Sequence, residues 1–150
     1  MKKLNFKSNQ SGFTMIELAI AFAVIAVVLL AVIPGAGLLN SGKIHSAART
    51  IHTLEVGSKS YLAAGNTNYT GISLTTLKTA NHIPNGFTGN GPWGSGAYTI
   101  AANAGDSSLV DVALTEVPAT EGATLITLFT NTAASVPVYD AATNTLTLTF

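Results

Sequence analysis

Residues Leu18–Ile33 read LAIAFAVIAVVLLAVI and contain only alanine, valine, isoleucine, leucine and phenylalanine. When this run is extended to residues 13–39, its only strongly polar members are Thr14 and Glu17. A helix that crosses a bilayer needs about 20 mostly apolar residues. The stretch 13–39 is therefore predicted to form a helix that can span a membrane.

The charges around this run give it a direction. Lys2, Lys3 and Lys7 precede it without any acid, which places the N-terminus on the cytoplasmic side and sends the rest of the chain outward. Only 9% of the residues are charged and the formal net charge is zero, so a strongly basic nucleic-acid binder is excluded. The absence of cysteine excludes disulfides, thiolate metal sites and a cysteine nucleophile.

Two ordinary interpretations of such a beginning are a permanent anchor and a cleaved secretory signal. A secretory signal has a short apolar stretch followed by a cleavage site of small residues. Residues 34–37 (PGAG) fit such a cleavage site loosely. Against it, Glu17 directly abuts the apolar run, and the polar stretch 7–12 precedes the run instead of following it.

The junction 11–18 (SGFTMIEL) is similar to the processing site of type IV prepilins and pseudopilins. The resemblance extends over about the first forty residues and implies a leader peptide, 1–12. It further implies that a membrane peptidase cuts after Gly12 and methylates the new amino terminus at Phe13. Glu17 then occupies the family's glutamate position, and Pro34 the position at which the family often carries proline.

Glu17 is a carboxylate in an apolar helix, and cleavage after Gly12 would supply a cation for it. A carboxylate within a membrane-spanning helix costs at least ~2.5–3.5 kcal/mol and usually marks a functional site. Cleavage creates the amine of Phe13, with an unperturbed pKa of about 7.7–8.0. The resemblance implies that Glu17 pairs with the Phe13 amine of a neighbouring subunit during assembly. Pairing within one chain stays open, because residues four apart share a helix face.

The apolar run continues into a second helical segment. Pro34 and Gly35 predict a kink or an unwound stretch over 31–38, or else simply the end of the membrane span. Beyond it, apolar residues recur at helical spacing, namely Ile44, Ala47, Ala48, Ile51, Leu54 and Leu62. Glu55 and Lys59 form a favourable i,i+4 pair, and Gly65 and Asn66 are stop signals. One helix is expected over about 14–64, within a segment 13–64.

The remaining residues, 65–150, are expected to form a β-rich head. Threonine accounts for 17 of these residues, which favours strands. Alternation predicts strands at 110–115 and 145–150, with weaker candidates at 97–101 and 136–139. The apolar stretch 124–129 fits either a central strand or a short helix. A turn-rich connector covers 65–96. The predicted fold class is α+β, a long helix packed on a C-terminal antiparallel sheet, as in the type IV pilin fold.

Signals for catalysis, cofactors or metals are weak. Gly89, Gly91 and Gly94 match G-x-G-x-x-G, but Pro92 interrupts them and no strand or helix is expected at the required places. His45 and His52 could share a helix face, yet no third ligand is evident, so both are expected to face solvent. No catalytic residue, cofactor or metal site is predicted. The acidic head, with Lys78 against five carboxylates, argues against DNA binding by this subunit.

The resemblance implies a structural subunit rather than an enzyme. It would be inserted in the inner membrane as a single-pass prepilin, then polymerised into a helical homo-oligomeric filament outside the cell. Its partners would be the prepilin peptidase and methyltransferase, the pilus assembly ATPase and the inner-membrane platform. Alternatives are a pseudopilin of a type II secretion system and a secreted β-rich binding module. The connector is loosely similar to type IVb and conjugative thin-pilus pilins, whereas the short leader and Phe13 are more like type IVa.

Overall fold

The computed structural model describes the backbone of residues 15–150 and the side chains of 15–25 and 39–150. The predicted leader 1–12 and the junction Gly12–Phe13 lie outside the described residues. The chain divides into two compact units, Met1–Leu38 and Leu39–Phe150. Each unit is described by itself below.

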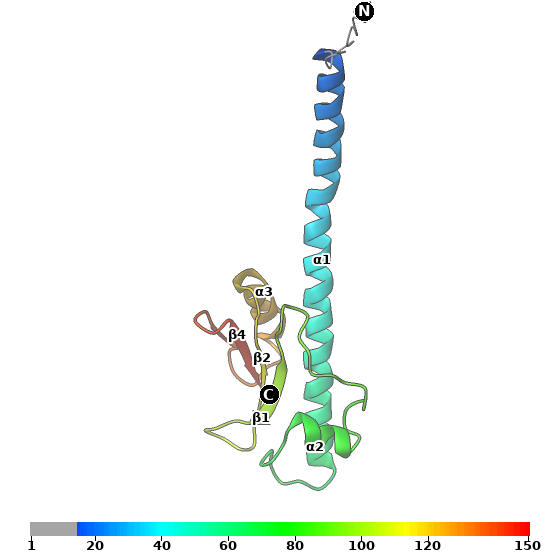
Figure 1. The fold of residues 1–150 in the computed structure, drawn as a ribbon. Helices are drawn as coiled ribbons and strands as arrows, with labels where there is room; N and C mark the ends of the chain where they lie inside the picture. Colours follow the sequence, from blue (N-terminus) through cyan, green and yellow to red (C-terminus); the bar gives the residue numbers. More distant parts are fainter. Residues whose placement is uncertain (1–14) are drawn as a thin grey trace, which may run out of the picture. The chain divides into compact units, whose positions relative to one another are not determined.

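Helix α1 extends over Met15–Ala63, close to the predicted range 14–64 (Figure 1). It contains Pro34 and Gly35 without interruption, so the unwound stretch predicted there is absent, whereas a kink stays a prediction. Proline removes one backbone donor, but its fixed φ lies in the helical range, and its neighbours in sequence include good helix formers. The helix ends at Ala63, just before the predicted stop signal Gly65, whose φ of 103° does not fit an α-helix.

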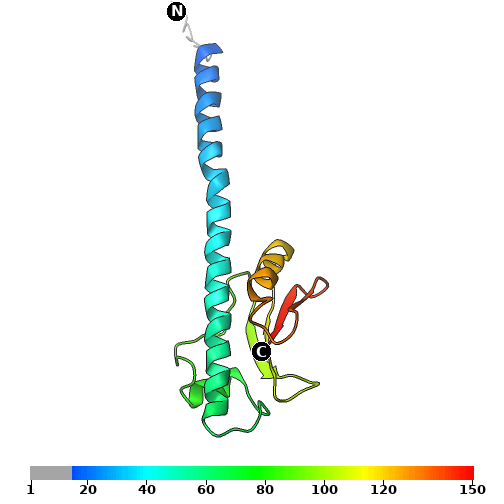
Figure 2. The ribbon, with the colours of Figure 1, turned by 180° about the vertical axis from the view of Figure 1, so that it is seen from behind.

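Four antiparallel strands form one sheet, in agreement with the predicted α+β class (Figures 1 and 2). They are β1 (Tyr98–Ala102), β2 (Val110–Leu114), β3 (Val138–Asp140) and β4 (Thr145–Thr149). The spatial order is β1-β2-β4-β3. All four strands overlap the segments whose alternation predicted them.

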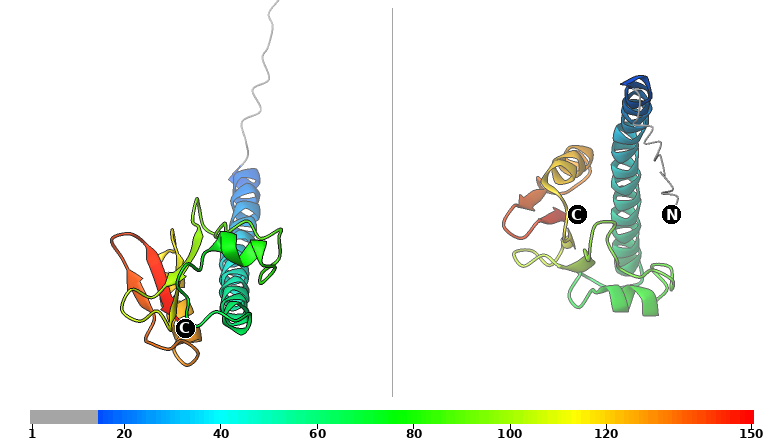
Figure 3. Two further views of the ribbon diagram at one scale, coloured as in Figure 1. Left: turned by 90° about the horizontal axis from the view of Figure 1, so that it is seen from below. Right: turned by 45° about the horizontal axis from the view of Figure 1, so that its top comes forward.

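The sheet buries one face. In register, Ile100 pairs with Val112 and Val112 with Leu148, so alternate apolar side chains line up across three strands. These side chains belong to one core cluster with Ala47, Ile51 and Leu54 of α1. The views of Figure 3 show the sheet beside the C-terminal part of this helix. The apolar stripe predicted from Ile44 onward therefore packs against the head.

Two short helices complete the head. Helix α3 (Ala119–Phe129) contains the stretch 124–129, so of the two predicted alternatives the helix is correct. Helix α2 (Leu74–Thr79) lies inside the predicted connector and was not predicted from the sequence. It begins with a capping box in which Ser73 and Thr76 each bond the other's backbone N–H.

The glycine-rich loop before β1 is held by close backbone contacts. The Gly91 N–H donates to the Gly96 carbonyl at 2.6 Å, and Asn90 bridges to Ala97. A Cβ at Gly96 would lie 2.4 Å from the Thr115 carbonyl oxygen. Gly91 and Gly96 thus allow the loop to pack against the end of β2.

Candidate assembly site

The sequence-predicted site lies at the N-terminal end of α1. Its cleavage residues Gly12 and Phe13 are outside the described residues, but Glu17 is exposed in the first helical turn. A carboxylate at this position interacts favourably with the helix dipole. No other charged residue occurs between positions 15 and 42.

The side chains around Glu17 make the surface apolar on all sides. Seven large ones are between 50% and 92% exposed, namely Met15, Ile16, Leu18, Ile20, Phe22, Val24 and Ile25. Since a helix turns once in 3.6 residues, these positions point in every direction around its axis. A helix that is apolar all round is normally covered by lipid or protein. This first unit therefore needs a covering that its own described residues do not provide.

A search for membrane spans restricted to the described residues finds no helix of sufficient length and apolarity. Much of the predicted span 13–39 falls on residues 13–14 and on the side chains of 26–38, which are outside the description. The span stays a prediction from the sequence.

A comparison with protein families adds a specific finding. The family model of the prokaryotic N-terminal methylation motif matches residues 7–33, a range that contains Gly12, Phe13 and Glu17. This match in the N-terminal segment supports a type IV pilin or prepilin-like protein. Neither a curated protein nor a solved structure gives a match to the chain. The motif ends before Pro34, so what the head of this protein does must be argued from its own residues.

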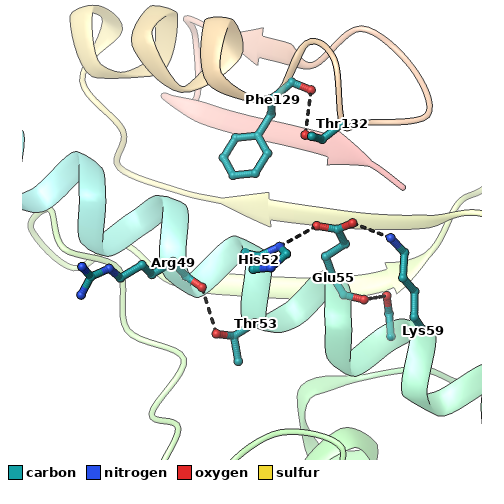
Figure 4. A network of polar contacts seen from close by, with 8 residues as sticks. Arg49, His52, Thr53, Glu55, Lys59, Phe129 and Thr132 are labelled. Carbon is teal, nitrogen blue, oxygen red and sulfur yellow. Dashed lines mark hydrogen bonds and ion pairs between the residues drawn. The ribbon is translucent and has the colours of Figure 1, made fainter.

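A buried carboxylate ties the second half of α1 into the head. Glu55 is 7% exposed and lies between two basic side chains of the same helix, His52 and Lys59 (Figure 4). Lys59 Nζ is 2.6 Å from Glu55 Oε1, and His52 Nδ1 is 3.0 Å from Oε2. The predicted Glu55–Lys59 pair is therefore present, but the sequence did not show that the acid is buried or that His52 joins it.

The partners of Glu55 keep it ionised. Burial raises the pKa of Glu55, but hydrogen bonds from Lys59 and His52 and their positive charges lower it by more, so its pKa lies below the usual range. Both partners are largely exposed, and the carboxylate is the buried member of the group. The arrangement thus holds a charged carboxylate on the buried side of α1.

A second buried acid links α3 to α1 within the head unit. Glu121, in the first turn of α3, is 8% exposed, and its Oε1 accepts a hydrogen bond from Asn40 Nδ2 at 2.8 Å. Gly122 beside it lets α3 approach the sheet, because a Cβ there would lie 2.8 Å from the Tyr139 ring. The contact between Asn40 and Glu121 was not predicted from the sequence, because 81 positions separate the two residues.

The far end of α1 is fastened to the segment after α2. Ser60 Oγ and His82 Nδ1 are 2.8 Å apart, and the Tyr61 and His82 rings meet edge to face. Gly57 faces the same segment, where a Cβ would lie 2.5 Å from Ile83 Cγ2. The head is therefore attached to α1 near residue 40 and again near residues 57–61.

The polar groups of the head are structural in character. Among the residues that could be searched, no three histidine, cysteine or acidic side chains gather in a possible metal site. His45 is exposed, and His52 is bonded to Glu55. Burial raises the pKa of Tyr98 to about 12, against a smaller lowering by the Thr50 side chain, so its phenol stays protonated. The described geometry is that of a folded module held on a helix whose other end is apolar.

Proposed function

We propose that the chain is a structural subunit of a type IV pilus. The leader 1–12 is cut off after Gly12, the new amino terminus at Phe13 is methylated, and the product 13–150 polymerises into a helical filament on the cell surface. In this organisation 13–64 forms the assembly helix, with 13–39 in the membrane first and in the filament core later. Residues 65–150 form the head, with a connector over 65–96.

One observation supports this proposal most strongly. The methylation motif at 7–33 overlaps the start of α1, where residues 15–25 expose apolar side chains on all sides and Glu17 is the one charged residue. An apolar helix of this kind can be covered by lipid before assembly and by the same helix of other copies afterwards. The apolar side chains of the head, in contrast, are buried in one core together with Ala47, Ile51 and Leu54 of α1.

Glu17 is proposed to guide assembly. A carboxylate in an apolar surrounding is stabilised by a nearby cation, and the Phe13 amine of a neighbouring subunit is a cation that only cleavage creates. The pair would form only between processed subunits, so it would couple processing to polymerisation.

The proposal includes partners that other chains supply. They are a prepilin peptidase and methyltransferase, the assembly ATPase and its inner-membrane platform, and the inner membrane itself before assembly. The chain has a building role and is not proposed to be an enzyme.

The processing step is tested by intact mass and N-terminal sequencing of sheared surface filaments. We expect an abundant polypeptide that begins at a methylated Phe13. A product that retains residues 1–12, or that begins beyond Gly35, contradicts the proposal. A correctly processed product together with a secretion defect and no visible fibre in the deletion strain would identify a pseudopilin instead.

The assembly step is tested by Glu17→Val and Glu17→Gln in the full chain. Both variants are expected to be processed normally and to lose at least nine tenths of the filament yield in electron micrographs. Ile16→Val is the matched control, since it changes the neighbouring residue but preserves apolarity, and it should leave the yield unchanged. Normal filament yield from both Glu17 variants would remove the assembly role.

A further inference from the structure

Two asparagines of the head are each followed directly by glycine, at Asn85–Gly86 and at Asn90–Gly91. Such an asparagine can react with its own backbone, because glycine has no side chain to hinder the attacking nitrogen. Asparagine is accordingly among the thermally labile residues. The two pairs are equivalent in local sequence and both asparagines are exposed, so any difference in their reactivity comes from the surrounding structure.

The reaction needs no partner other than water. The backbone nitrogen of the glycine attacks Cγ of the asparagine and loses its proton, and the side-chain nitrogen leaves as ammonia. A five-membered cyclic imide results. Water then adds to one of the two imide carbonyls and breaks its bond to nitrogen, which yields either aspartate or isoaspartate without any change of oxidation state.

The structure leaves the nitrogen of Gly86 free to attack. Among the described residues, the Gly86 N–H has no hydrogen-bond partner. A Cβ built on Gly86 would have nothing within 4 Å, so the backbone has room to rotate there. The bond that closes this turn runs from the Phe87 N–H to the Pro84 carbonyl at 3.0 Å, and it does not involve the attacking nitrogen.

The side chain of Asn85 is held only weakly. Its Nδ2 donates to Asn81 Oδ1 at 3.3 Å, a long hydrogen bond at an exposed position. The turn can therefore open locally at a low cost in free energy.

The nitrogen of Gly91, in contrast, is held in place. Its N–H donates to the Gly96 carbonyl at 2.6 Å, and the bridge between Asn90 and Ala97 fixes the residue before it. A Cβ at Gly91 would lie 2.9 Å from Leu114 Cδ1. Attack on Asn90 would require this hydrogen bond and this packing to be broken first.

We propose that Asn85 is a site of spontaneous covalent modification, at which the chain converts the amide to aspartate and isoaspartate while Asn90 stays intact. The product adds a negative charge to a head in which Lys78 is the only lysine or arginine. It forms just after His82 and Ile83, which contact the far end of α1. This inference does not depend on the proposed pilus function.

The test follows the two sites in one incubation. The full chain is kept folded in detergent at mildly alkaline pH in water enriched in heavy oxygen, and is then digested in ordinary water with trypsin and chymotrypsin. Cleavage after Lys78, Phe87 and Trp93 separates the sites into peptides 79–87 and 88–93. We expect peptide 79–87 to gain heavy oxygen and to become a substrate for an isoaspartate methyltransferase, at least roughly tenfold faster than peptide 88–93 changes.

Two controls accompany this measurement. In guanidinium the two sites should react at similar rates, because unfolding removes the structural difference between them. Gly86→Ala adds one methyl group where the structure has open space, and it should slow the change in peptide 79–87 by roughly tenfold.

Three results would overturn the inference. Equal or faster reaction at Asn90 in the folded chain would mean that the structure does not protect it. No product at Asn85, over a time in which the unfolded chain reacts, would mean that the turn does not open. An undiminished change in peptide 79–87 of Gly86→Ala would place the reaction at Asn81 instead.

Discussion

The two halves of helix α1 differ in how far their apolar side chains are exposed. From Met15 to Ile25 the large apolar side chains are half exposed or more, and Glu17 is the only charge. In the second half Ala47, Ile51 and Leu54 are fully buried against the head, whereas Lys43, Arg49 and Lys59 are exposed. One helix therefore carries a surface that other molecules must cover and a surface that its own chain covers.

The difference shows that one helix can expose an apolar surface at one end and take part in the core of a folded head at the other. Substitutions in the second half should act on the stability of the single chain, whereas those in the first half should act on assembly. The experiments below test this division through the free energy of unfolding of the full chain in detergent. The chain has one tryptophan, Trp93, and it is 5% exposed, so its fluorescence reports unfolding of the head.

Leu54→Ala should have the largest effect. Leu54 is fully buried, so its truncation removes apolar contacts and leaves a cavity, and we expect a loss of about 2–5 kcal/mol. Ile20→Ala is the matched control, 58% exposed, and should change unfolding by less than about 0.5 kcal/mol. If both variants lost the same free energy of unfolding, the first half of α1 would unfold cooperatively with the head. The proposed difference between the two halves would then be wrong.

Gly57→Ala tests the close approach of the segment after α2. The new Cβ would lie 2.5 Å from Ile83 Cγ2 and 3.2 Å from the His82 carbonyl oxygen, so packing must shift. Gly42→Ala makes the same change on the same helix where nothing lies within 4 Å. Since the helix propensity gain is common to both, Gly57→Ala should be less stable than Gly42→Ala by about 1–3 kcal/mol. No difference in guanidinium unfolding would show that this contact is loose.

Glu55→Gln should have the smallest effect, and one that depends on pH. The folded chain has a Glu55 pKa below the usual value of 4.5, so the stabilisation by its charge is present above that pH and is lost as the pH falls through the folded pKa. Above pH 5 we expect the variant to be less stable by about 1 kcal/mol.

The control for this experiment is the free energy of unfolding measured at acid pH. The pKa values of Asp106 and Asp140 are also lowered, by hydrogen bonds from Ser108 and from Thr143 and nearby backbone. Both acids are present in either chain, so they cancel in the difference. Wild type and variant should converge only when the pH has fallen through the lowered folded pKa of Glu55, and a difference that no longer changes with pH at the acid end would mean that the substitution removes shape complementarity rather than charge.

Much of the fold followed from local sequence signals. The alternation at Val110–Leu114 and Thr145–Thr149 marked two strands, and Gly65 marked the end of α1. These features depend on neighbours in sequence, which a pattern can reveal. The threonine content gave a mixed result, because six of the 17 threonines of residues 65–150 lie in α2 and α3 rather than in strands. Tertiary packing overrides such propensities.

The two short helices illustrate the limit of pattern reading. Helix α3 is apolar on both faces, so it has no periodicity to distinguish it from a buried strand, and its one acid points inward to Asn40. Helix α2 has only six residues, and its capping box uses threonine where glutamate or glutamine is usual. Neither signal is strong enough by itself to identify a helix.

The sequence alone determined that a long apolar helix with one carboxylate precedes a β-rich segment, because composition and periodicity are local properties of the chain. The tertiary structure decided which polar side chains are buried, such as Glu55 and Glu121, and which apolar side chains are left on the outside, such as Leu128 of α3. Burial depends on what packs opposite a residue, and the partner of Glu121 lies 81 positions away in the chain. No window of sequence contains both members of such a pair.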